Sequence, residues 1–286
     1  MQAQSFRFET APGFYIDGNG WGDPTAPPII LLHGGGQTRH SWGDTALKLA
    51  EKGWYAVSYD ARGHGASSWS ADGNYLTDAL VSDLKAVITQ IGGKPALIGA
   101  SMGGITALVL DGESAESPVS AVVLVDIAPK AEQKGIERIF AFMSAHLENG
   151  FGSLEEAAEA VAAYLPQRQK NYDHSRPEKN LRYRDGRYYW HWDPQMLRVW
   201  KNTTPDQQIA YEERLFSAAQ HLKAPTLIVR GGISDVVSER VMAEFLDAVP
   251  HVRSMTVSGA GHMVAGDSNH AFTNAVIAFL EEVYPV

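Results

Sequence analysis

The sequence predicts an α/β fold, in which a mainly parallel central sheet carries helices on both faces. Short apolar runs alternate with longer helix-like segments along most of the chain, and strands that are buried on both faces have this composition. A length of 286 residues suffices for one large domain of this kind. The turn Gly99-Ala100-Ser101-Met102-Gly103 also joins an apolar run to a following helical segment.

The individual elements follow from the local patterns. Most predicted strands are short apolar runs, and the predicted helices repeat apolar residues at helical spacing, as Leu80, Leu84, Val87 and Ile91 do. Strands are expected at 29–32, 55–59, 94–98, 119–125, 226–229 and 253–257. Helices are expected at 45–52, 76–91, 104–110, 239–249 and 271–284. In such a sheet the reactive groups gather at the carboxyl ends of the strands.

The segment 129–222 breaks this alternation. It contains no convincing buried strand, and 135–148 and 154–164 have helical patterns. We therefore predict a helical cap at 129–222, inserted after the 119–125 strand into a core formed by 1–128 and 223–286. An aromatic and cationic stretch at 179–192 could suggest RNA contact, but acidic residues surround it and no nucleic-acid module is recognisable, so we expect no nucleic-acid partner.

Composition narrows the functional classes. The net charge of −9 gives the chain as a whole no attraction for nucleic acid or an anionic membrane surface. The absence of cysteine excludes disulfides, thiol catalysis and thiolate metal sites. No apolar stretch approaches the roughly 20 residues of a membrane-spanning helix. The residues Met1 to Arg7 lack the pattern of a secretory signal, so we expect a cytoplasmic protein.

Ser101 is the strongest catalytic candidate. Its surroundings match Gly-x-Ser-x-Gly between a predicted strand and a predicted helix. A serine on such a tight turn projects its hydroxyl from the top of the sheet, and small flanking residues permit the close packing. The alternative interpretation is an ordinary glycine-rich turn. We predict that Ser101 is a nucleophile.

A serine hydroxyl needs a base, and the base needs an acid that orients it. His262 follows the last predicted strand in a loop of small residues, so we predict that it is the base. Asp235 follows the strand before that one, and the order Ser, Asp, His is typical of this architecture. We therefore favour Asp235 as the acid. Asp126, at the end of the 119–125 strand, is the alternative, and we interpret it as a capping or hinge residue beside the cap.

Acyl transfer also requires donors for the oxyanion of the tetrahedral intermediate. The backbone N–H of Met102 directly follows the nucleophile, and the glycine-rich loop after the first apolar strand offers Gly35, with Gly36 as the alternate. No metal or organic cofactor is implied. The cap aromatics include Phe142, Trp190 and Trp192, which we expect to line the substrate pocket.

With these motifs the chain resembles the α/β-hydrolase superfamily over essentially its whole length. The matching segments are His33-Gly34, Asp60-Ala61-Arg62-Gly63-His64-Gly65-Ala66-Ser67, Gly99 to Gly103, Gly232 to Asp235, and Gly261-His262. The second segment resembles the D-x-R-G-x-G-x-S loop of epoxide hydrolases, haloalkane dehalogenases and cofactor-free haloperoxidases, and we interpret it as structural. Epoxide hydrolases and haloalkane dehalogenases use an aspartate nucleophile, whereas this chain has Ser101.

The resemblance to the serine branch, which includes carboxylesterases and cofactor-free haloperoxidases, implies a serine hydrolase of small to medium carboxylic esters that forms an acyl-enzyme. Perhydrolase activity, or hydrolysis of a C–C bond or a lactone by the same triad, are alternatives. A non-catalytic ligand receptor on a hydrolase scaffold is a further one, although this chain retains a candidate for every triad position. The expected partner is a small-molecule ester, without nucleic acid or membrane, for a monomer or homodimer.

Overall fold

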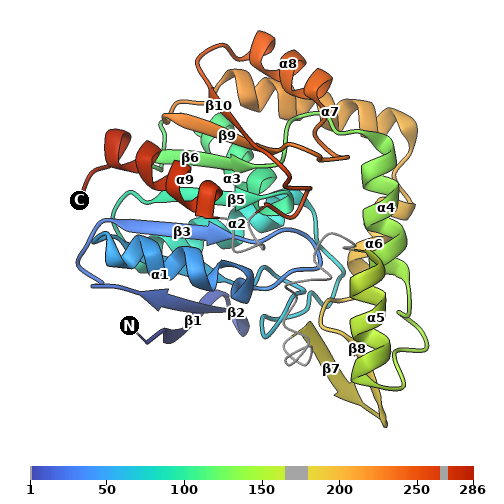
Figure 1. Ribbon diagram of the computed structural model, residues 1–286. Coiled ribbons are helices and arrows are strands. Elements are labelled where there is room, and N and C mark those ends of the chain that lie inside the picture. The colour runs from blue at the N-terminus through green and yellow to red at the C-terminus, as the bar shows by residue number, and fades with distance from the viewer. Residues whose placement is uncertain (1, 165–179, 265–269) are drawn as a thin grey trace.

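A mainly parallel sheet forms the centre of the protein (Figure 1). The computed structural model describes residues 2–164, 180–264 and 270–286. In these ranges eight strands pair in the order β1-β2-β4-β3-β5-β6-β9-β10. Their bounds are β1 (Gln4–Ala11), β2 (Phe14–Trp21), β3 (Pro28–Leu32), β4 (Tyr55–Tyr59), β5 (Ala96–Ala100), β6 (Ala121–Val125), β9 (Thr226–Gly231) and β10 (Arg253–Val257). The predicted fold class is confirmed.

The two N-terminal strands are the exception to the parallel arrangement. β1 pairs with β2, and β2 with β4, in antiparallel fashion, whereas β4, β3, β5, β6, β9 and β10 are parallel neighbours. β1 and β2 were not predicted from the sequence. Both strands alternate more and less exposed residues at the sheet edge, so neither contains the apolar run by which the buried strands were recognised.

Helices cover both faces of the sheet, as predicted. One apolar core lies between the sheet and the helices α2, α3, α7 and α8, and a second lies between the sheet and α1 and α9. These helices are α1 (Gly43–Glu51), α2 (Thr77–Ile91), α3 (Met102–Glu113), α7 (Pro205–Gln220), α8 (Glu239–Ala248) and α9 (His270–Val283), and a 3-10 turn, η1, spans Arg39–Trp42. None of the described helices is long and apolar enough to span a membrane.

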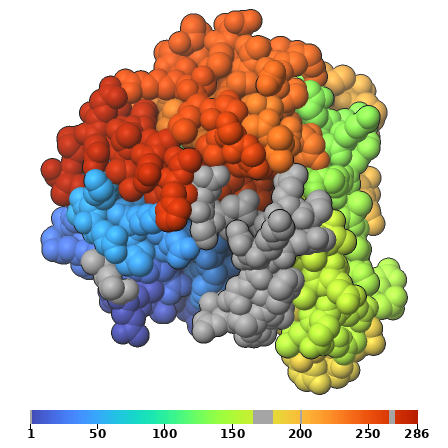
Figure 2. Space-filling model, in the orientation of Figure 1, coloured from blue at the N-terminus to red at the C-terminus, as the bar shows by residue number. Residues whose placement is uncertain are grey.

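Most of the chain between β6 and β9 stands beyond the carboxyl ends of the parallel strands, on the side toward which β3 points, whereas its last helix returns to the face of the sheet (Figure 1). It contains α4 (Gln133–Ser144), α5 (Leu154–Tyr164), α6 (Gln195–Lys201) and α7. In Figure 2 its green and yellow segments form one side of the molecule. α7, at the end of this segment, packs against α3 so closely that a Cβ on Gly112 would lie 2.1 Å from the carbonyl oxygen of Ala218. The boundaries 129–222 stay a prediction.

The inserted segment also contains a hairpin, which was not predicted from the sequence. β7 (Leu181–Arg184) and β8 (Arg187–Trp190) pair around Asp185 and Gly186, which both have positive φ angles of 52° and 79°. An Asp-Gly turn of this kind matches the twist of two antiparallel strands. Most residues of β7 are exposed, so the hairpin carried no pattern of buried residues by which it could have been predicted.

Candidate active site

Ser101 lies on a strained turn at the end of β5. Its φ of 46° and ψ of −114° are unusual for a residue with a side chain. The chain is so tight here that a Cβ on Gly99 would lie 2.5 Å from the carbonyl carbon of Gly103, and a Cβ on Gly103 would lie 2.5 Å from the oxygen of Leu32. The two glycines therefore permit the turn, and Ser101 lines a pocket at the top of the sheet.

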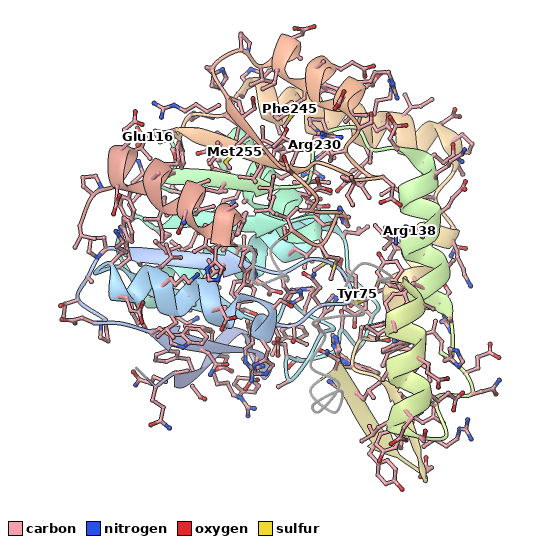
Figure 3. All side chains as sticks on the ribbon, in the orientation of Figure 1. Tyr75, Glu116, Arg138, Arg230, Phe245 and Met255 are labelled. Carbon is pink, nitrogen blue, oxygen red and sulfur yellow. The ribbon has the colours of Figure 1, made fainter. Side chains whose placement is uncertain are left out.

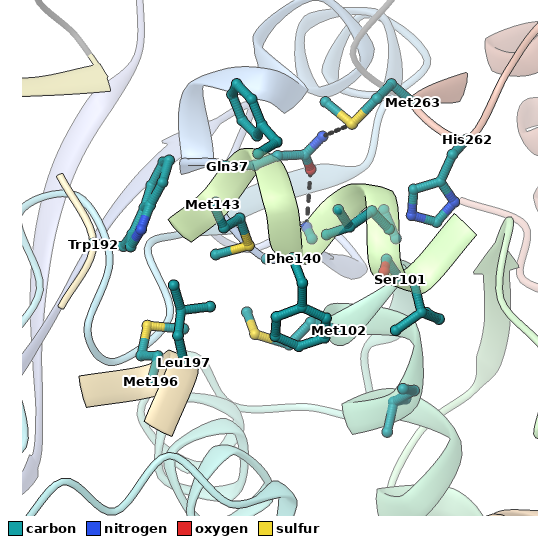
Figure 4. Close-up of a pocket in the computed structure, with 18 of the residues that line it drawn as sticks. Gln37, Ser101, Met102, Phe140, Met143, Trp192, Met196, Leu197, His262 and Met263 are labelled. Atoms are coloured by element: carbon teal, nitrogen blue, oxygen red, sulfur yellow. Dashed lines mark hydrogen bonds between the residues drawn. The ribbon is translucent and has the colours of Figure 1, made fainter. Parts of the chain in front are cut away.

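His262 lies in the loop after β10 and lines the same pocket, where Figure 4 shows its ring beside Ser101. Its Nδ1 lies 2.7 Å from Oδ2 of Asp126, and both side chains are almost completely buried. Because a carboxylate only accepts hydrogen bonds, Nδ1 carries the proton. The unprotonated Nε2 is then the nitrogen that remains for the serine hydroxyl.

Asp126 is held by a set of donors at the end of β6. The backbone N–H of Gly231 donates to Oδ1 at 2.7 Å, and the hydroxyl of Ser234 donates to Oδ2 at 2.5 Å. Asp126 is fully buried and has a φ of 49°, which turns the chain sharply away from the strand. With His262 as a third donor, the carboxylate is fixed in position and cannot reorient freely.

The prediction that Asp235 contacts His262 is wrong. Asp235 instead forms a two-pronged ion pair with Arg138 on α4, with distances of 2.5 and 2.9 Å, and both side chains are about 40% exposed (Figure 3 labels Arg138). Burial raises the pKa of Asp235, but the hydrogen bonds and positive charge of Arg138 outweigh it and hold that pKa below its usual value. The carboxylate therefore already has a cationic partner from the inserted segment.

The loop after β3 leaves one amide free beside the serine. The N–H of Gly34 donates to Oε1 of Gln37 at 2.9 Å, the N–H of Gly36 donates to Nε2 of His64 at 3.1 Å, and the N–H of Gln37 donates back to the carbonyl of Gly34. The N–H of Gly35 has no acceptor among the described residues. This favours Gly35 over Gly36 as a donor to a ligand in the pocket.

Met102 offers the second expected donor. It is the first residue of α3, and the first N–H groups of a helix have no partner within the helix. No acceptor within the described part of the chain pairs with the Met102 amide, and Met102 and Gly35 line the same pocket as Ser101. The helix N-terminus also favours negative charge at this point. The roles of Gly35 and Met102 in binding an oxyanion stay predictions.

Two buried histidines hold the loop after β3 through Gly36, a role that was not predicted from the sequence. His64 accepts the Gly36 N–H, while His191 accepts the N–H of Gly65 at 2.9 Å and donates to the carbonyl of Gly36 at 3.2 Å. Burial lowers the pKa of His64, and it lowers that of His191 to about 3. His191 comes from the inserted segment and lies between Trp190 and Trp192 in the sequence. Its position between two aromatic residues that line the pocket was the sequence feature that could have indicated a role near the site.

A second buried contact joins the inserted segment to the core. The hydroxyl of Tyr75 donates to Oδ2 of Asp193 at 2.5 Å, and both residues are buried. Figure 3 shows Tyr75 between the core and α4. Burial and the hydrogen bond to Asp193 raise the pKa of Tyr75. Together with His191, this contact fixes the position of β8 and α6 over the site.

The pocket encloses about 250 Å³ and is mainly apolar (Figure 4). Phe142, Trp190 and Trp192, which we expected to bind substrate, all lie in its lining. Other apolar residues of the lining include Ile136, Ile139, Phe140, Met143, Val161, Met196 and Leu197. The described lining contains no Asp, Glu, Lys or Arg side chain. Within the described ranges, no cluster of three or more His, Cys, Asp or Glu residues could hold a metal ion.

Comparison with known proteins agrees with this architecture. Residues 27–268 match the profile of the family described as alpha/beta hydrolase fold. The chain belongs to the α/β-hydrolase family. It is similar to the 3-hydroxybutyrate-oligomer hydrolase of Cupriavidus necator, with 30% identity over 85% of each chain. It is also similar to the esterase Rv0045c of Mycobacterium tuberculosis, with 31% identity over 91% of this chain and 85% of that protein.

Solved structures agree at the level of the fold. A structure of the esterase Rv0045c superposes on this α/β hydrolase with a TM-score of 0.76 and 28% sequence identity. The superposition covers 98% of this chain and 93% of the esterase chain. A structure of E-2-(acetamidomethylene)succinate hydrolase has a TM-score of 0.81 at 22% identity, over 98% and 100% of the two chains. At 22% identity, the second similarity supports only a shared fold.

In this α/β hydrolase, the contacts of the loop from Asp60 to Ser67 are structural ones. The Asp60 carboxylate is fully buried, accepts the backbone N–H groups of Arg39 and Ala66 at 2.7 and 2.9 Å, and pairs with the Arg39 guanidinium. The Arg62 guanidinium pairs with the Asp83 carboxylate on α2. The loop thereby holds His64 in place beneath the Gly36 amide.

Proposed function

We propose that this α/β hydrolase cleaves uncharged carboxylic esters through an acyl-enzyme on Ser101, with His262 as the base and Asp126 as the acid. The observation that carries the proposal is the buried hydrogen bond between His262 and Asp126, next to Ser101 in an apolar pocket. This arrangement fixes the imidazole tautomer that can accept a proton from the serine.

The chemistry follows from these positions. The Ser101 hydroxyl attacks the ester carbonyl while Nε2 of His262 takes its proton, and the Asp126 carboxylate stabilises the resulting imidazolium. The N–H groups of Gly35 and Met102 donate to the oxyanion. The imidazolium then protonates the leaving alcohol. Water, activated by the neutral His262, hydrolyses the acyl-enzyme and regenerates the Ser101 hydroxyl.

The lining of the pocket supports an uncharged substrate. A charged acyl or alcohol group would lose its hydration without gaining an ionic partner from the described lining residues. The names of the two relatives, an esterase and a hydrolase of 3-hydroxybutyrate oligomers, support ester hydrolysis. We propose small to medium esters, because a cavity of about 250 Å³ is smaller than most sites for drug-sized ligands.

Active-site labelling with a fluorophosphonate, combined with a panel of p-nitrophenyl esters, tests the proposal. The wild-type protein should be labelled at Ser101 and should hydrolyse the esters. The Ser101→Ala variant should fold, resist labelling and lose at least about 10³-fold in kcat. Labelling on another serine, or near-normal turnover by Ser101→Ala, would overturn the mechanism.

A further inference from the structure

Gln37 joins the loop after β3 to the loop that carries His262. Its Oε1 accepts the backbone N–H of Gly34 at 2.9 Å, and its Nε2 donates to Sδ of Met263 at 3.0 Å (Figure 4). Met263 directly follows His262 in the chain, and Gln37 and Met263 both line the pocket. One side chain therefore contacts the two loops that carry the Gly35 amide and the base.

These two contacts require a carboxamide. A backbone N–H is only a donor, so Gly34 needs the oxygen of the side chain, whereas a thioether is only an acceptor, so Met263 needs its nitrogen. The two partners thus fix which way the carboxamide of Gln37 points. An ionised glutamate would supply no donor at this position, and a lysine would supply no acceptor.

Gln37 also fixes the direction of the amide beside Ser101. The carbonyl of Gly34 and the N–H of Gly35 belong to one planar peptide unit, in which they point in opposite directions. That carbonyl accepts the backbone N–H of Gln37 at 3.1 Å and Nδ1–H of His33 at 2.8 Å, so the direction of the Gly35 N–H is fixed as well. A Cβ on Gly34 would lie 3.3 Å from Cβ of Ser101, which places this peptide next to the serine.

We propose that Gln37 is a positioning residue, which holds the Gly35 amide and the His262 loop in the relative position that the tetrahedral intermediate requires. This rests on the proposed function, in which the Gly35 N–H donates to the oxyanion and His262 is the base. A donor to an oxyanion acts mainly on the transition state, where the negative charge develops. Loss of its alignment should therefore lower kcat and leave KM nearly unchanged.

The chain offers a matched control, because a second glutamine makes the same local hydrogen bond. Oε1 of Gln207, at the start of α7, accepts the backbone N–H of Thr204 at 2.9 Å, three positions earlier, as Gln37 does with Gly34. Gln207 lies outside the pocket lining. Gln37→Met and Gln207→Met each replace the carboxamide with an uncharged, flexible side chain, and only the first should affect the site.

Steady-state kinetics on p-nitrophenyl butanoate compare the two variants. Gln37→Met should lower kcat by about 10- to 100-fold, somewhat less than complete loss of an oxyanion donor. Its KM should stay within about threefold of the wild type, and Gln207→Met should keep both constants. An unchanged kcat in Gln37→Met, or an equal decrease in Gln207→Met, would overturn the proposal.

A pair of ketones separates positioning from a change in pocket shape. In methyl hexyl ketone the carbonyl stays intact, whereas Oγ of Ser101 adds to the carbonyl carbon of trifluoromethyl hexyl ketone, its proton passes to His262, and the carbonyl electron pair forms an oxyanion. The ratio of the two Ki values, methyl over trifluoromethyl, measures the preference for the adduct. Gln37→Met should lower this preference by about the same factor as kcat. An unchanged preference would overturn the proposal, because pocket shape affects both ketones alike.

Met263→Leu keeps the test decisive if Gln37→Met folds poorly. Leucine nearly conserves the volume of methionine and removes the sulfur acceptor, while Gln37 can keep its bond to Gly34. We expect kcat and the preference to fall together by about 2- to 5-fold, as the loss of one weak hydrogen bond implies. No decrease in either quantity would overturn the proposal.

Failure of the proposed function gives a separate result. The wild type would then show no preference for the trifluoromethyl ketone, and Ser101→Ala would still hydrolyse the ester. If Ser101 is the nucleophile and Gln37 is not a positioning residue, the wild type shows the preference and Gln37→Met retains it.

Discussion

Nδ1 of His262 lies 2.7 Å from Oδ2 of Asp126, although the two residues are 136 positions apart in the chain. The contact depends on the order of the strands. β9 lies between β6, which ends at Asp126, and β10, which leads to His262. Gly231, the last residue of β9, donates its N–H to the same carboxylate. Three neighbouring strand ends therefore assemble the pair.

We predict that Asp126→Asn lowers kcat by about 10² to 10⁴ on p-nitrophenyl esters, because the amide disfavours the imidazole tautomer that the serine needs. Asp235→Asn should keep kcat within about threefold of the wild type. It should reduce the free energy of unfolding by no more than about 1 kcal/mol, because its ion pair with Arg138 is substantially exposed. Steady-state kinetics and urea unfolding of both variants provide the measurement. An inactive Asp235→Asn with an active Asp126→Asn would reverse the assignment.

The misplaced acid shows what a single sequence can predict. Both β6, which leads to Asp126, and β9, which leads to Asp235, were predicted from the sequence. The prediction also placed both carboxylates at the carboxyl-end edge of the sheet. The choice between the two carboxylates depended on contacts that a linear pattern does not contain. Asp235 is paired with Arg138, from the inserted segment. Asp126 has a positive φ and contacts His262. Ser101 and His262 could be chosen as candidates because a local motif and a position in the chain distinguish them.

The turn at Ser101 should limit stability. A side chain at φ 46° and ψ −114° is strained by about 1 to 3 kcal/mol, and glycine relieves that strain. Against this, glycine makes the unfolded chain more flexible by about 0.4 to 1 kcal/mol. We therefore expect Ser101→Gly to be more stable than Ser101→Ala by about 1 kcal/mol in urea unfolding, while both variants are inactive. A more stable Ser101→Ala would show that the surrounding structure favours a Cβ at this position.

His191 should make stability depend on pH. Burial, opposed by the negative charge of Asp60, lowers its pKa from the usual 6.5 to about 3 in the folded protein. The folded state therefore binds fewer protons than the unfolded state between these values. The stabilising contribution is complete above pH 6.5 and decreases as the pH falls toward about 3. The decrease should reach about 1.4 kcal/mol per pH unit at most.

The variant His191→Gln isolates this effect, since its carboxamide can both accept and donate but does not titrate in this range. The free energy of unfolding of the wild type should fall more steeply between pH 6 and about 4 than that of His191→Gln. Titrating groups that do not interact with His191 contribute equally to both proteins and cancel in the comparison. Parallel pH profiles would mean that His191 is not buried in its neutral form.

The pocket aromatics should set the preferred length of the acyl chain. The Phe142 ring stacks on the Tyr164 ring, with centroids 4.1 Å apart, and its centroid lies 5.3 Å from that of the Trp190 ring. All three residues line the pocket. Each methylene that enters the pocket should contribute about 0.8 kcal/mol, or roughly fourfold in kcat/KM, until the space is filled. We therefore expect kcat/KM to rise over short p-nitrophenyl esters and then to fall. Phe142→Ala should move the optimum to a longer or bulkier acyl group.

The matched control for Phe142→Ala is Tyr183→Ala, which removes an aromatic ring from β7 that is 67% exposed and outside the pocket lining. Its chain-length profile should equal that of the wild type. Comparing profiles rather than absolute rates cancels any loss of folded protein, which matters because truncating a packed aromatic ring also destabilises the inserted segment. If Phe142→Ala kept the wild-type optimum, Phe142 would stabilise the inserted segment without contacting the acyl chain. A shift with Phe142→Ala and none with Tyr183→Ala would identify the aromatic pocket as the part of the enzyme that measures the substrate.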